Sequence, residues 1–168
     1  MRKKKKLKLK EDAFWASFCF FNLPKEQDEI PVHMRRVNFR LGGVSDEGLE
    51  LMAGYIKTIE QLDLDETEIT VEGVQHLTRL QSIKELRLKG CRQINNDALP
   101  YLFQLQDLEL LHLGGTSISV DALTEIGKLK RLKTLLISAD ENEMHFLPAI
   151  VGQLPAGCEF IVNHQNYP

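Results

Sequence analysis

The stretch Ile83-Lys-Glu-Leu86-Arg-Leu88 contains the pattern that decides the fold: an apolar residue, two variable residues, then Leu-x-Leu. The same phrase opens at Ile59, Leu108 and Leu132, so the successive steps are 24, 25 and 24 residues. A weaker copy opens at Met34. Self-similarity at such a period is typical of stacked repeats, in which each unit packs only against its neighbours. The pattern therefore predicts a solenoid.

Each unit is expected to contain a strand and a helix. Leu-x-Leu places apolar side chains two residues apart, which is the period of a half-buried strand. The inward-facing pairs should be Val37/Phe39, Leu62/Leu64, Leu86/Leu88, Leu111/Leu113 and Leu135/Ile137. Further along each unit, apolar residues three apart predict one stripe on a helix. These triplets are Val74, Leu77 and Leu80; Leu99, Leu102 and Leu105; and Leu123, Ile126 and Leu129.

Capping residues mark the expected helix starts. Each candidate N-cap is followed within two residues by an acid, which suits the positive end of a helix. The four candidates are Ser45, Thr70, Asn95 and Ser119. The turns before these helices should be filled by Val44, Ile69, Ile94 and Ile118. Beyond Leu135 we expect a last helix with Met144, Leu147, Ile150 and Leu154 on one face, and a final strand within residues 157–163.

The third unit shows the subtype of the repeat. It reads Leu86-Arg-Leu88-Lys-Gly-Cys91-Arg-Gln-Ile94-Asn-Asn-Asp97-Ala-Leu99, and it resembles the cysteine-containing leucine-rich repeat. This type occurs in the tails of F-box proteins and in mitochondrial proteins of the ATP synthase coupling factor B group. The other units carry Thr67, Thr116 and Gly42 at the position of Cys91. We interpret Cys91 as a packing residue, since packing accepts a hydroxyl where thiol chemistry does not.

The resemblance spans residues 34–163 and implies an α/β fold: a right-handed leucine-rich-repeat solenoid, or horseshoe, of about five strand–helix repeats with a parallel concave sheet and an N-terminal cap. The stretch that follows Phe21-Asn-Leu-Pro24 is too short for an F-box, so a role in ubiquitin ligation is not expected. The expected organisation is a basic tail over residues 1–12, an aromatic cap over 13–33, and the repeat domain over 34–168.

The amino-terminal segment has more than one interpretation. Seven of the 21 Lys and Arg residues lie in the first ten positions, and five aromatics follow: Phe14, Trp15, Phe18, Phe20 and Phe21. These aromatics are expected to cap the first repeat. The alternatives are an anchor on a membrane surface or a basic arm on RNA. Glu11 and Asp12 interrupt any secretion signal, so we expect a cytoplasmic protein, with mitochondrial or secreted locations as alternatives.

Composition and motifs do not indicate an enzyme. Net charge is -3 over 168 residues, which gives no overall attraction to nucleic acid or membrane. Three cysteines without metal-type spacing favour a reducing compartment. The histidines form no zinc-type pairs, and neither a phosphate loop nor a nucleophile elbow is present. We therefore expect no catalytic, cofactor-binding or metal-binding residues and no cofactor.

The outward side chains of the strands are the candidate binding residues. They should line the concave face, where charge runs basic, acidic and basic before a milder zone begins: Arg36, Asn38, Arg40, Asp63, Asp65, Glu85, Arg87, Lys89, Leu110, His112 and Leu136. Such a mixture favours a protein partner of unknown identity over nucleic acid. An ordinary solvated face with cross-strand pairs, such as Asp63 with Arg87, is the alternative.

The expected function is therefore a non-catalytic protein–protein interaction module, an adaptor or assembly subunit, that binds a partner through the concave face. The alternative is a peripheral subunit of a membrane or ribonucleoprotein complex, held by the basic and aromatic amino terminus. Under this alternative, contact with membrane or nucleic acid would be confined to that terminus.

Overall fold

The computed structural model describes residues 11–15, 30–40 and 43–168. The predictions for the basic residues within 1–10, for Phe18, Phe20 and Phe21, and for Gly42 lie outside these ranges. Most of the expected aromatic cap also lies outside them.

The protein has an α/β architecture built on one seven-stranded sheet. The strands are β1 (His33–Asn38), β2 (Thr58–Asp63), β3 (Ser82–Arg87), β4 (Leu110–His112), β5 (Thr134–Ile137), β6 (Glu159–Val162) and β7 (Gln165–Asn166). They follow one another in chain order across the sheet. The first six are parallel, and β7 runs antiparallel to β6.

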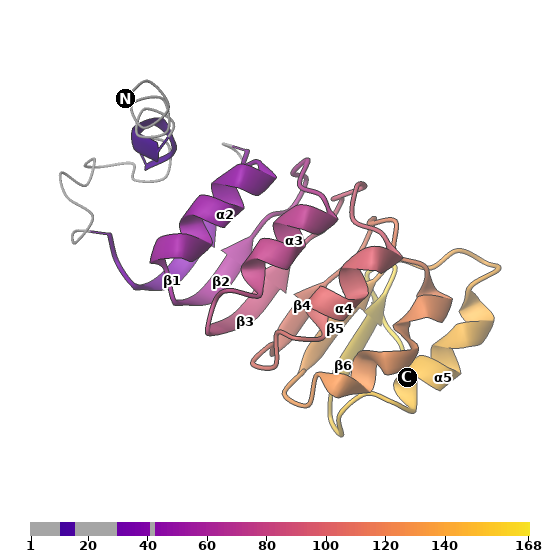
Figure 1. Ribbon diagram of the computed structural model, residues 1–168. Helices are drawn as coiled ribbons and strands as arrows, with labels where there is room; N and C mark the ends of the chain where they lie inside the picture. Colours follow the sequence, from indigo (N-terminus) through magenta and orange to yellow (C-terminus); the bar gives the residue numbers. More distant parts are fainter. Residues whose placement is uncertain (1–10, 16–29, 41–42) are drawn as a thin grey trace.

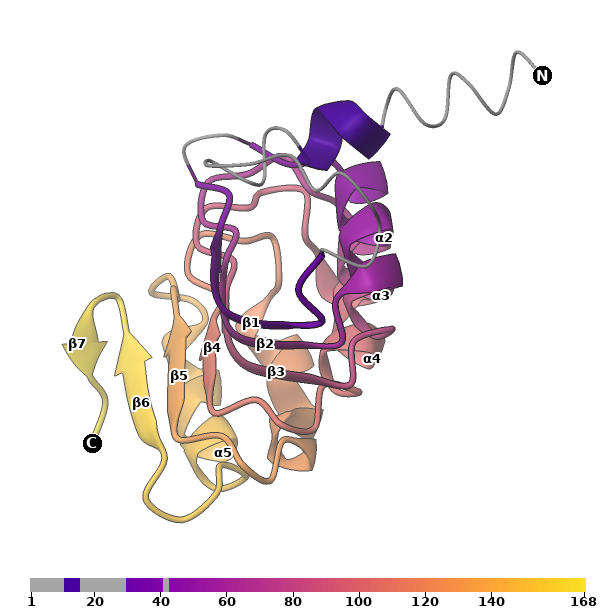
Figure 2. The same cartoon turned by 90° about the vertical axis from the view of Figure 1, so that its left-hand side faces the viewer.

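A helical segment returns the chain from each parallel strand to the next (Figure 1). The α-helices are α2 (Asp46–Tyr55), α3 (Val71–Leu77), α4 (Leu99–Leu102) and α5 (Leu147–Val151). The 3₁₀ helices are η2 (Asn96–Ala98), η3 (Val120–Lys128) and η4 (Met144–Phe146). Figure 2 shows the strands on one side of the molecule and α2, α3 and α4 on the other.

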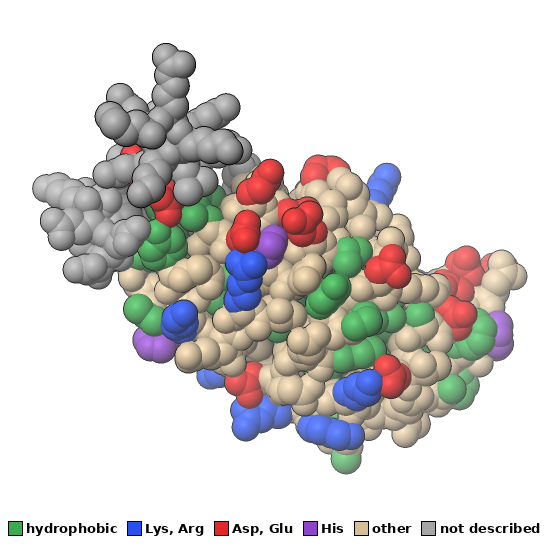
Figure 3. All heavy atoms as spheres, viewed as in Figure 1, with side chains coloured by type: hydrophobic (Ala, Val, Ile, Leu, Met, Phe, Trp, Pro, Cys, Tyr) green, Lys and Arg blue, Asp and Glu red, His purple; other side chains and the backbone are tan. Residues whose placement is uncertain are grey.

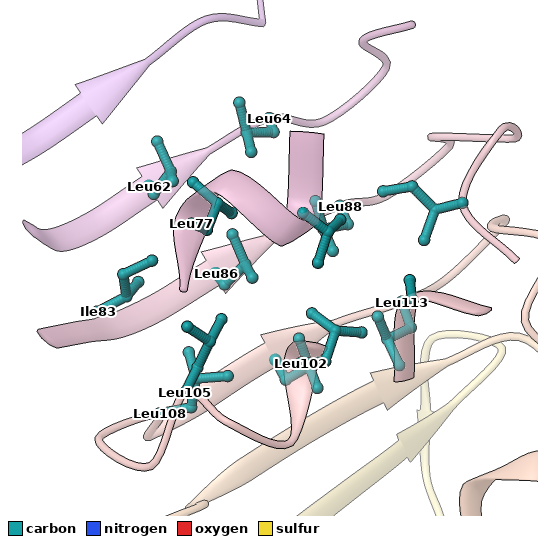
Figure 4. Close-up of a cluster of buried hydrophobic side chains, with 14 of the residues drawn as sticks. Leu62, Leu64, Leu77, Ile83, Leu86, Leu88, Leu102, Leu105, Leu108 and Leu113 are labelled. Carbon is teal, nitrogen blue, oxygen red and sulfur yellow. The ribbon is translucent and has the colours of Figure 1, made fainter. Parts of the chain in front are cut away.

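The core lies between these two layers (Figure 4). Strand register places equivalent residues of neighbouring units side by side, because every parallel pair is joined at a step of 24 or 25 residues. One such row crosses the sheet, and each member is at most 4% exposed: Val37, Leu62, Leu86, Leu111, Leu135 and Phe160. The predicted inward pairs and the three helix triplets of the second to fourth units are all buried. The strand and helix periodicities therefore identified the core correctly.

The helical halves differ in type from unit to unit. The second unit has the α-helix α3, whereas the fourth has the 3₁₀ helix η3. In η3 the buried residues Leu123 and Ile126 lie three positions apart, and Leu129 follows three later. A spacing of three matches the three residues per turn of a 3₁₀ helix, so this stripe faces the core without α-helical winding.

Three of the four predicted N-caps bond as expected. Ser45, Thr70 and Asn95 accept hydrogen bonds from the backbone amides of Gly48, Glu72 and Asp97. Ser119 stands at the predicted position, but its side chain makes no capping bond. Ser119 therefore occupies the N-cap position, but the prediction that its side chain caps the helix is wrong.

The Ser119 hydroxyl is instead engaged with the side chain of Asn96 in the preceding unit. The first amide of η3, that of Val120, donates to Glu143 Oε1 of the following unit at 3.1 Å. A carboxylate from a neighbouring unit thus takes the place of the local cap.

The carboxyl-terminal end departs from the repeating pattern. Leu147 and Ile150 are buried as predicted, but Met144 is 43% exposed, so the expected last stripe is only partly correct. The predicted final strand is β6. It continues through Asn163 and His164 into β7, with φ values of 50° and 68° at these two residues. A two-residue turn with both φ values positive is a type I′ hairpin, whose twist matches that of the flanking strands.

At the other end, residues 11–15 are helical and lie against the first unit (Figure 1). Trp15 is 4% exposed, and its ring meets Tyr55 edge-on at 5.5 Å between centroids. The Phe14 ring lies 6.3 Å from that of Phe39. The Tyr55 hydroxyl donates to Glu11 Oε1 at 2.6 Å. These contacts bury apolar surface at the β1 end of the sheet.

Candidate functional site

The described helices leave one face of the sheet uncovered (Figure 2). We call this the open face. It carries the strand side chains that alternate with the buried rows, and its register pairs them across the sheet: Asn38, Asp63, Arg87, His112, Leu136 and Ile161 form its central row. Most of the candidate residues predicted for the concave face lie at these outward strand positions, whereas Arg40, Asp65 and Lys89 follow the ends of β1, β2 and β3.

Strands β1 to β3 carry a hydrogen-bonded polar network on the open face. Arg36 Nε donates to Gln61 Oε1 at 2.8 Å, and Gln61 Nε2 donates to Glu85 Oε2 at 2.9 Å. Asn38 Nδ2 donates to Asp63 Oδ2 at 3.3 Å. Their side chains surround a shallow hollow of about 220 Å³. This half of the open face is therefore polar, with its donors and acceptors largely matched to one another.

Asp65 is the candidate residue that the structure corrects most clearly. Its side chain is fully buried, so it cannot meet a partner directly as predicted. Arg87 pairs with Asp65, with Nη2 3.0 Å from Oδ2, and not with Asp63 as the cross-strand alternative assumed. The Lys89 amide also donates to Asp65 Oδ1 at 2.9 Å. A buried carboxylate requires such partners, and here it fixes the position of Arg87.

An apolar zone follows on β4 to β6. Leu110, Leu136 and Ile161 are partly exposed there, and strand register places Leu136 beside Ile161. Ile161 was not among the predicted binding residues. Its position 25 residues after Leu136 would have revealed it, had the repeat been extended across the final strand.

A pocket of about 120 Å³ opens beside this apolar zone. Its polar lining consists of Lys89, His112, Ser138 and His164, and its apolar wall includes Leu136 and Ile161. His112 is only 6% exposed, and burial lowers the pKa of its imidazole below the ordinary value of 6.5. Sequence reasoning missed His164, because it joins the pocket only through the hairpin between β6 and β7.

On the helix-bearing side, hydrophobic side chains gather in the middle (Figure 3). Figure 3 shows acidic side chains mostly toward its upper edge and Lys and Arg mostly toward its lower edge. Several are paired across units, as Arg79 is with Glu50 at 3.2 Å and Arg131 with Asp107 at 2.6 Å. Exposed pairs of this kind contribute little individually.

Cys91 occupies a buried structural position. Its Sγ donates to the carbonyl oxygen of Leu64 at 3.0 Å and lies 3.5 Å from Thr67 Oγ1. Thr67 and Thr116, at the same position in other units, donate to the carbonyls of Leu64 and Leu113. Burial raises the pKa of the Cys91 thiol, which favours its unreactive protonated form.

In residues 11–15, 30–40 and 43–168, no three His, Cys, Asp or Glu side chains gather as they would around a metal ion. None of the helices in those same ranges is long and apolar enough to cross a membrane.

No protein-family model matches the chain, and no curated protein matches it either.

Proposed function

We propose that the chain is a leucine-rich-repeat solenoid of the cysteine-containing type, which binds another protein through its open face as an adaptor or assembly subunit. The sequential parallel strands, each followed by a helical return at a step of 24 or 25 residues, support the proposed architecture. The open face corresponds to the concave face of such a solenoid.

The observation that carries the proposal is the uncovered face of a parallel sheet. Parallel sheets ordinarily have both faces covered by helices, because crossover connections place helices there. Here the described helices lie on one side only (Figure 2). The six parallel strands therefore present a broad and ordered surface to an external partner.

The chemistry of the open face suits a protein partner. Specific interfaces combine a desolvated apolar centre with polar groups that set orientation. Leu110, Leu136 and Ile161 provide the apolar part, and the network from Arg36 through Gln61 to Glu85 provides the polar part. Arg87 is held by buried Asp65, so its guanidinium is pre-positioned, which lowers the entropic cost of binding.

The test replaces the apolar part of the open face. We expect Leu110→Lys with Leu136→Lys to reduce capture of the partner from native lysate at least about tenfold, since each introduces a charge where apolar contact is needed. The matched control is Met144→Lys with Val151→Lys. These two are exposed apolar residues in η4 and α5, and they receive the same added charge.

Captured proteins would be quantified by mass spectrometry for the wild type and both double variants. Support requires a protein that is retained by the control and lost by the open-face variant at an unchanged melting temperature. If both double variants capture the same proteins in the same amounts, binding through the open face is wrong.

A second candidate function rests on the basic amino terminus. Seven of the 21 Lys and Arg residues lie in the first ten positions, and each basic residue near an anionic membrane contributes about 1 kcal/mol. We propose as the alternative that this segment holds the protein at a membrane or in a ribonucleoprotein complex. Deleting residues 1–10 should release the protein from the membrane or ribonucleoprotein fraction of a cell lysate. Unchanged fractionation would contradict this candidate.

A further inference from the structure

The pocket beside His112 is unusual on the open face because its polar groups have no partners. Within the described residues, the side chains of Lys89, His112, Ser138 and His164 make no hydrogen bond or ion pair with one another or with other groups. On the same face, Arg36, Gln61 and Glu85 are by contrast joined by hydrogen bonds. The pocket therefore offers several free donors at one place.

Among the polar side chains of the pocket, His112 gives the strongest evidence for a binding site. The residue is 6% exposed, and its Nδ1 is enclosed without a hydrogen-bond partner among the described residues. Burying a polar group without a hydrogen bond is unfavourable, and such groups in folded proteins call for an explanation. The other ring nitrogen, Nε2, faces Gly114 at the pocket and is the atom of the ring that an occupant can bond.

Gly114 keeps the pocket open. A Cβ at this position would lie 3.1 Å from His112 Nε2 and 3.3 Å from Ser138 Oγ. Any side chain here would therefore crowd both polar groups. The backbone of Gly114 does not have a positive φ, so its conformation alone does not demand glycine. The missing side chain instead leaves His112 and Ser138 accessible to an occupant.

The charge of the lining identifies the class of occupant. No Asp or Glu lines the pocket, and the nearby Asp65 is already bound by Arg87 and by the Lys89 amide. Lys89 supplies one positive charge, while Ser138 and the imidazoles supply hydrogen-bond donors. This one positive charge matches the single charge of a carboxylate better than the charge of -1.5 to -2 of a phosphate group at pH 7.

The apolar wall indicates where the carboxylate comes from. Leu136 and Ile161 lie side by side in the lining of the pocket and favour an occupant with apolar groups next to its charge. We propose that the pocket receives the carboxylate of an Asp or Glu side chain of a protein partner, whose apolar neighbours lie on Leu136 and Ile161. This inference rests on the proposed function, because it assigns a chemistry to part of the same open face.

Peptide titration followed by nuclear magnetic resonance tests the pocket directly. The probes are acetyl-Leu-Glu-Leu-amide and acetyl-Leu-Gln-Leu-amide, which differ only in the charged group, together with inorganic phosphate. We expect the Glu peptide to shift the amide signals of Gly90, Gly114 and Gly115 saturably. The Gln peptide should bind about tenfold more weakly, since charge-assisted hydrogen bonds are roughly twice as strong as neutral ones.

Two variants and one control accompany the titration. Gly114→Ala fills the pocket, and His164→Gly removes one imidazole. The latter places glycine at a φ of 68°, where it is favoured, so the hairpin is retained. Both should weaken binding of the Glu peptide about tenfold. Gly54→Ala is the matched control, because a Cβ there meets nothing within 4 Å. It should leave binding unchanged.

Equal affinity for the two peptides, stronger shifts with phosphate than with the Glu peptide, or wild-type binding by Gly114→Ala would each overturn the inference. The lysate capture separates this failure from failure of the proposed function. If a partner is lost by the Leu110 and Leu136 variant but retained by Gly114→Ala, binding through the open face is supported and the proposed carboxylate site in the pocket is refuted. If the Leu110 and Leu136 variant captures the same proteins as the wild type, the proposed function is refuted. The peptide titration then still tests whether the pocket binds a carboxylate.

Discussion

Asp65 and His112 show how two buried polar residues on the same face acquire different roles. Asp65 accepts hydrogen bonds from Arg87 and from the Lys89 amide, so its charge is compensated within the protein. His112 has no hydrogen bond from its ring among the described residues. Burial alone therefore does not define function at the scale of the residue. The number of satisfied bonds separates a structural carboxylate from an available imidazole.

The buried imidazole predicts a pH-dependent stability. Burial lowers the pKa of His112 in the folded state, while the unfolded chain has the ordinary value of 6.5. The unfolded state then binds more protons between these two values, so stability is complete above about pH 6.5 and is lost as pH falls through the folded pKa. Asp65 opposes this shift of the pKa, and Arg87, Lys89 and His164 reinforce it.

The measurement compares the wild type with His112→Leu by urea denaturation between pH 8 and pH 5. We expect the free energy of unfolding of the wild type to fall relative to that of the variant as pH decreases. Leu does not titrate, so it removes only the contribution of this histidine. The prediction would be refuted if the difference in free energy of unfolding between the two proteins stayed constant with pH. It would also be refuted if the wild type gained stability relative to the variant as pH decreased.

At the scale of the element, the helix starts of neighbouring units are linked to one another. The Thr70 amide donates to Asp46 Oδ1 at 2.9 Å, and the Thr70 hydroxyl donates to Asp46 Oδ2 at 2.6 Å. The Ser119 amide likewise donates to Asn96 Oδ1 at 2.9 Å. The residue after one N-cap thus accepts from the N-cap of the next unit. These bonds join adjacent helices beyond their apolar contacts.

This link predicts coupling between Asp46 and Thr70. Each single change to Ala should lower the free energy of unfolding by about 1–2 kcal/mol, because a cap or its partner is lost. The double variant should cost at least about 0.5 kcal/mol less than the sum, since both changes remove the same bonds. Urea denaturation of the four proteins measures the cycle.

Ser119→Ala is the comparison at the equivalent position of the fourth unit. Its hydroxyl caps no amide of η3, so its expected cost is below about 1 kcal/mol. Costs that add to within about 0.3 kcal/mol in the Asp46 and Thr70 cycle would show that the two residues act independently.

At the scale of the whole molecule, the two ends of the sheet are covered by different kinds of structure. The β1 end is covered in part by Phe14 and Trp15, which pack on Phe39 and Tyr55. The β6 end is closed by the antiparallel strand β7, and Tyr167 packs edge-on against Phe160 at 5.7 Å. An exposed parallel edge would present unpaired backbone groups to another chain. The short hairpin therefore protects β6.

Removing residues 163–168 should expose that edge. We expect the shortened protein to form larger species with rising concentration and to melt several degrees lower, because β6 loses its neighbour and Phe160 loses Tyr167. Light scattering after size-exclusion chromatography measures the first effect and calorimetry the second. A control lacking only Pro168 should behave like the full chain. An unchanged elution and melting temperature for the longer deletion would contradict a protective role for β7.

The repeat period and the local pattern of capping residues were enough to predict strands β1 to β6, the buried rows and three of the four caps, but not β7. The repeat period also identified most of the side chains on the open face, although Asp65 and His112 are buried. It did not reveal that Arg87 pairs with Asp65, that Ser119 bonds Asn96, or that His164 reaches the pocket.

Those features depend on the sizes and bonds of side chains from different units once the units lie side by side. Gly114 illustrates the reason: its missing side chain matters only because His112 and Ser138 are next to it in space. A one-dimensional pattern specifies which face a residue occupies, whereas its burial and its partners on that face are set by the neighbours that packing brings to it.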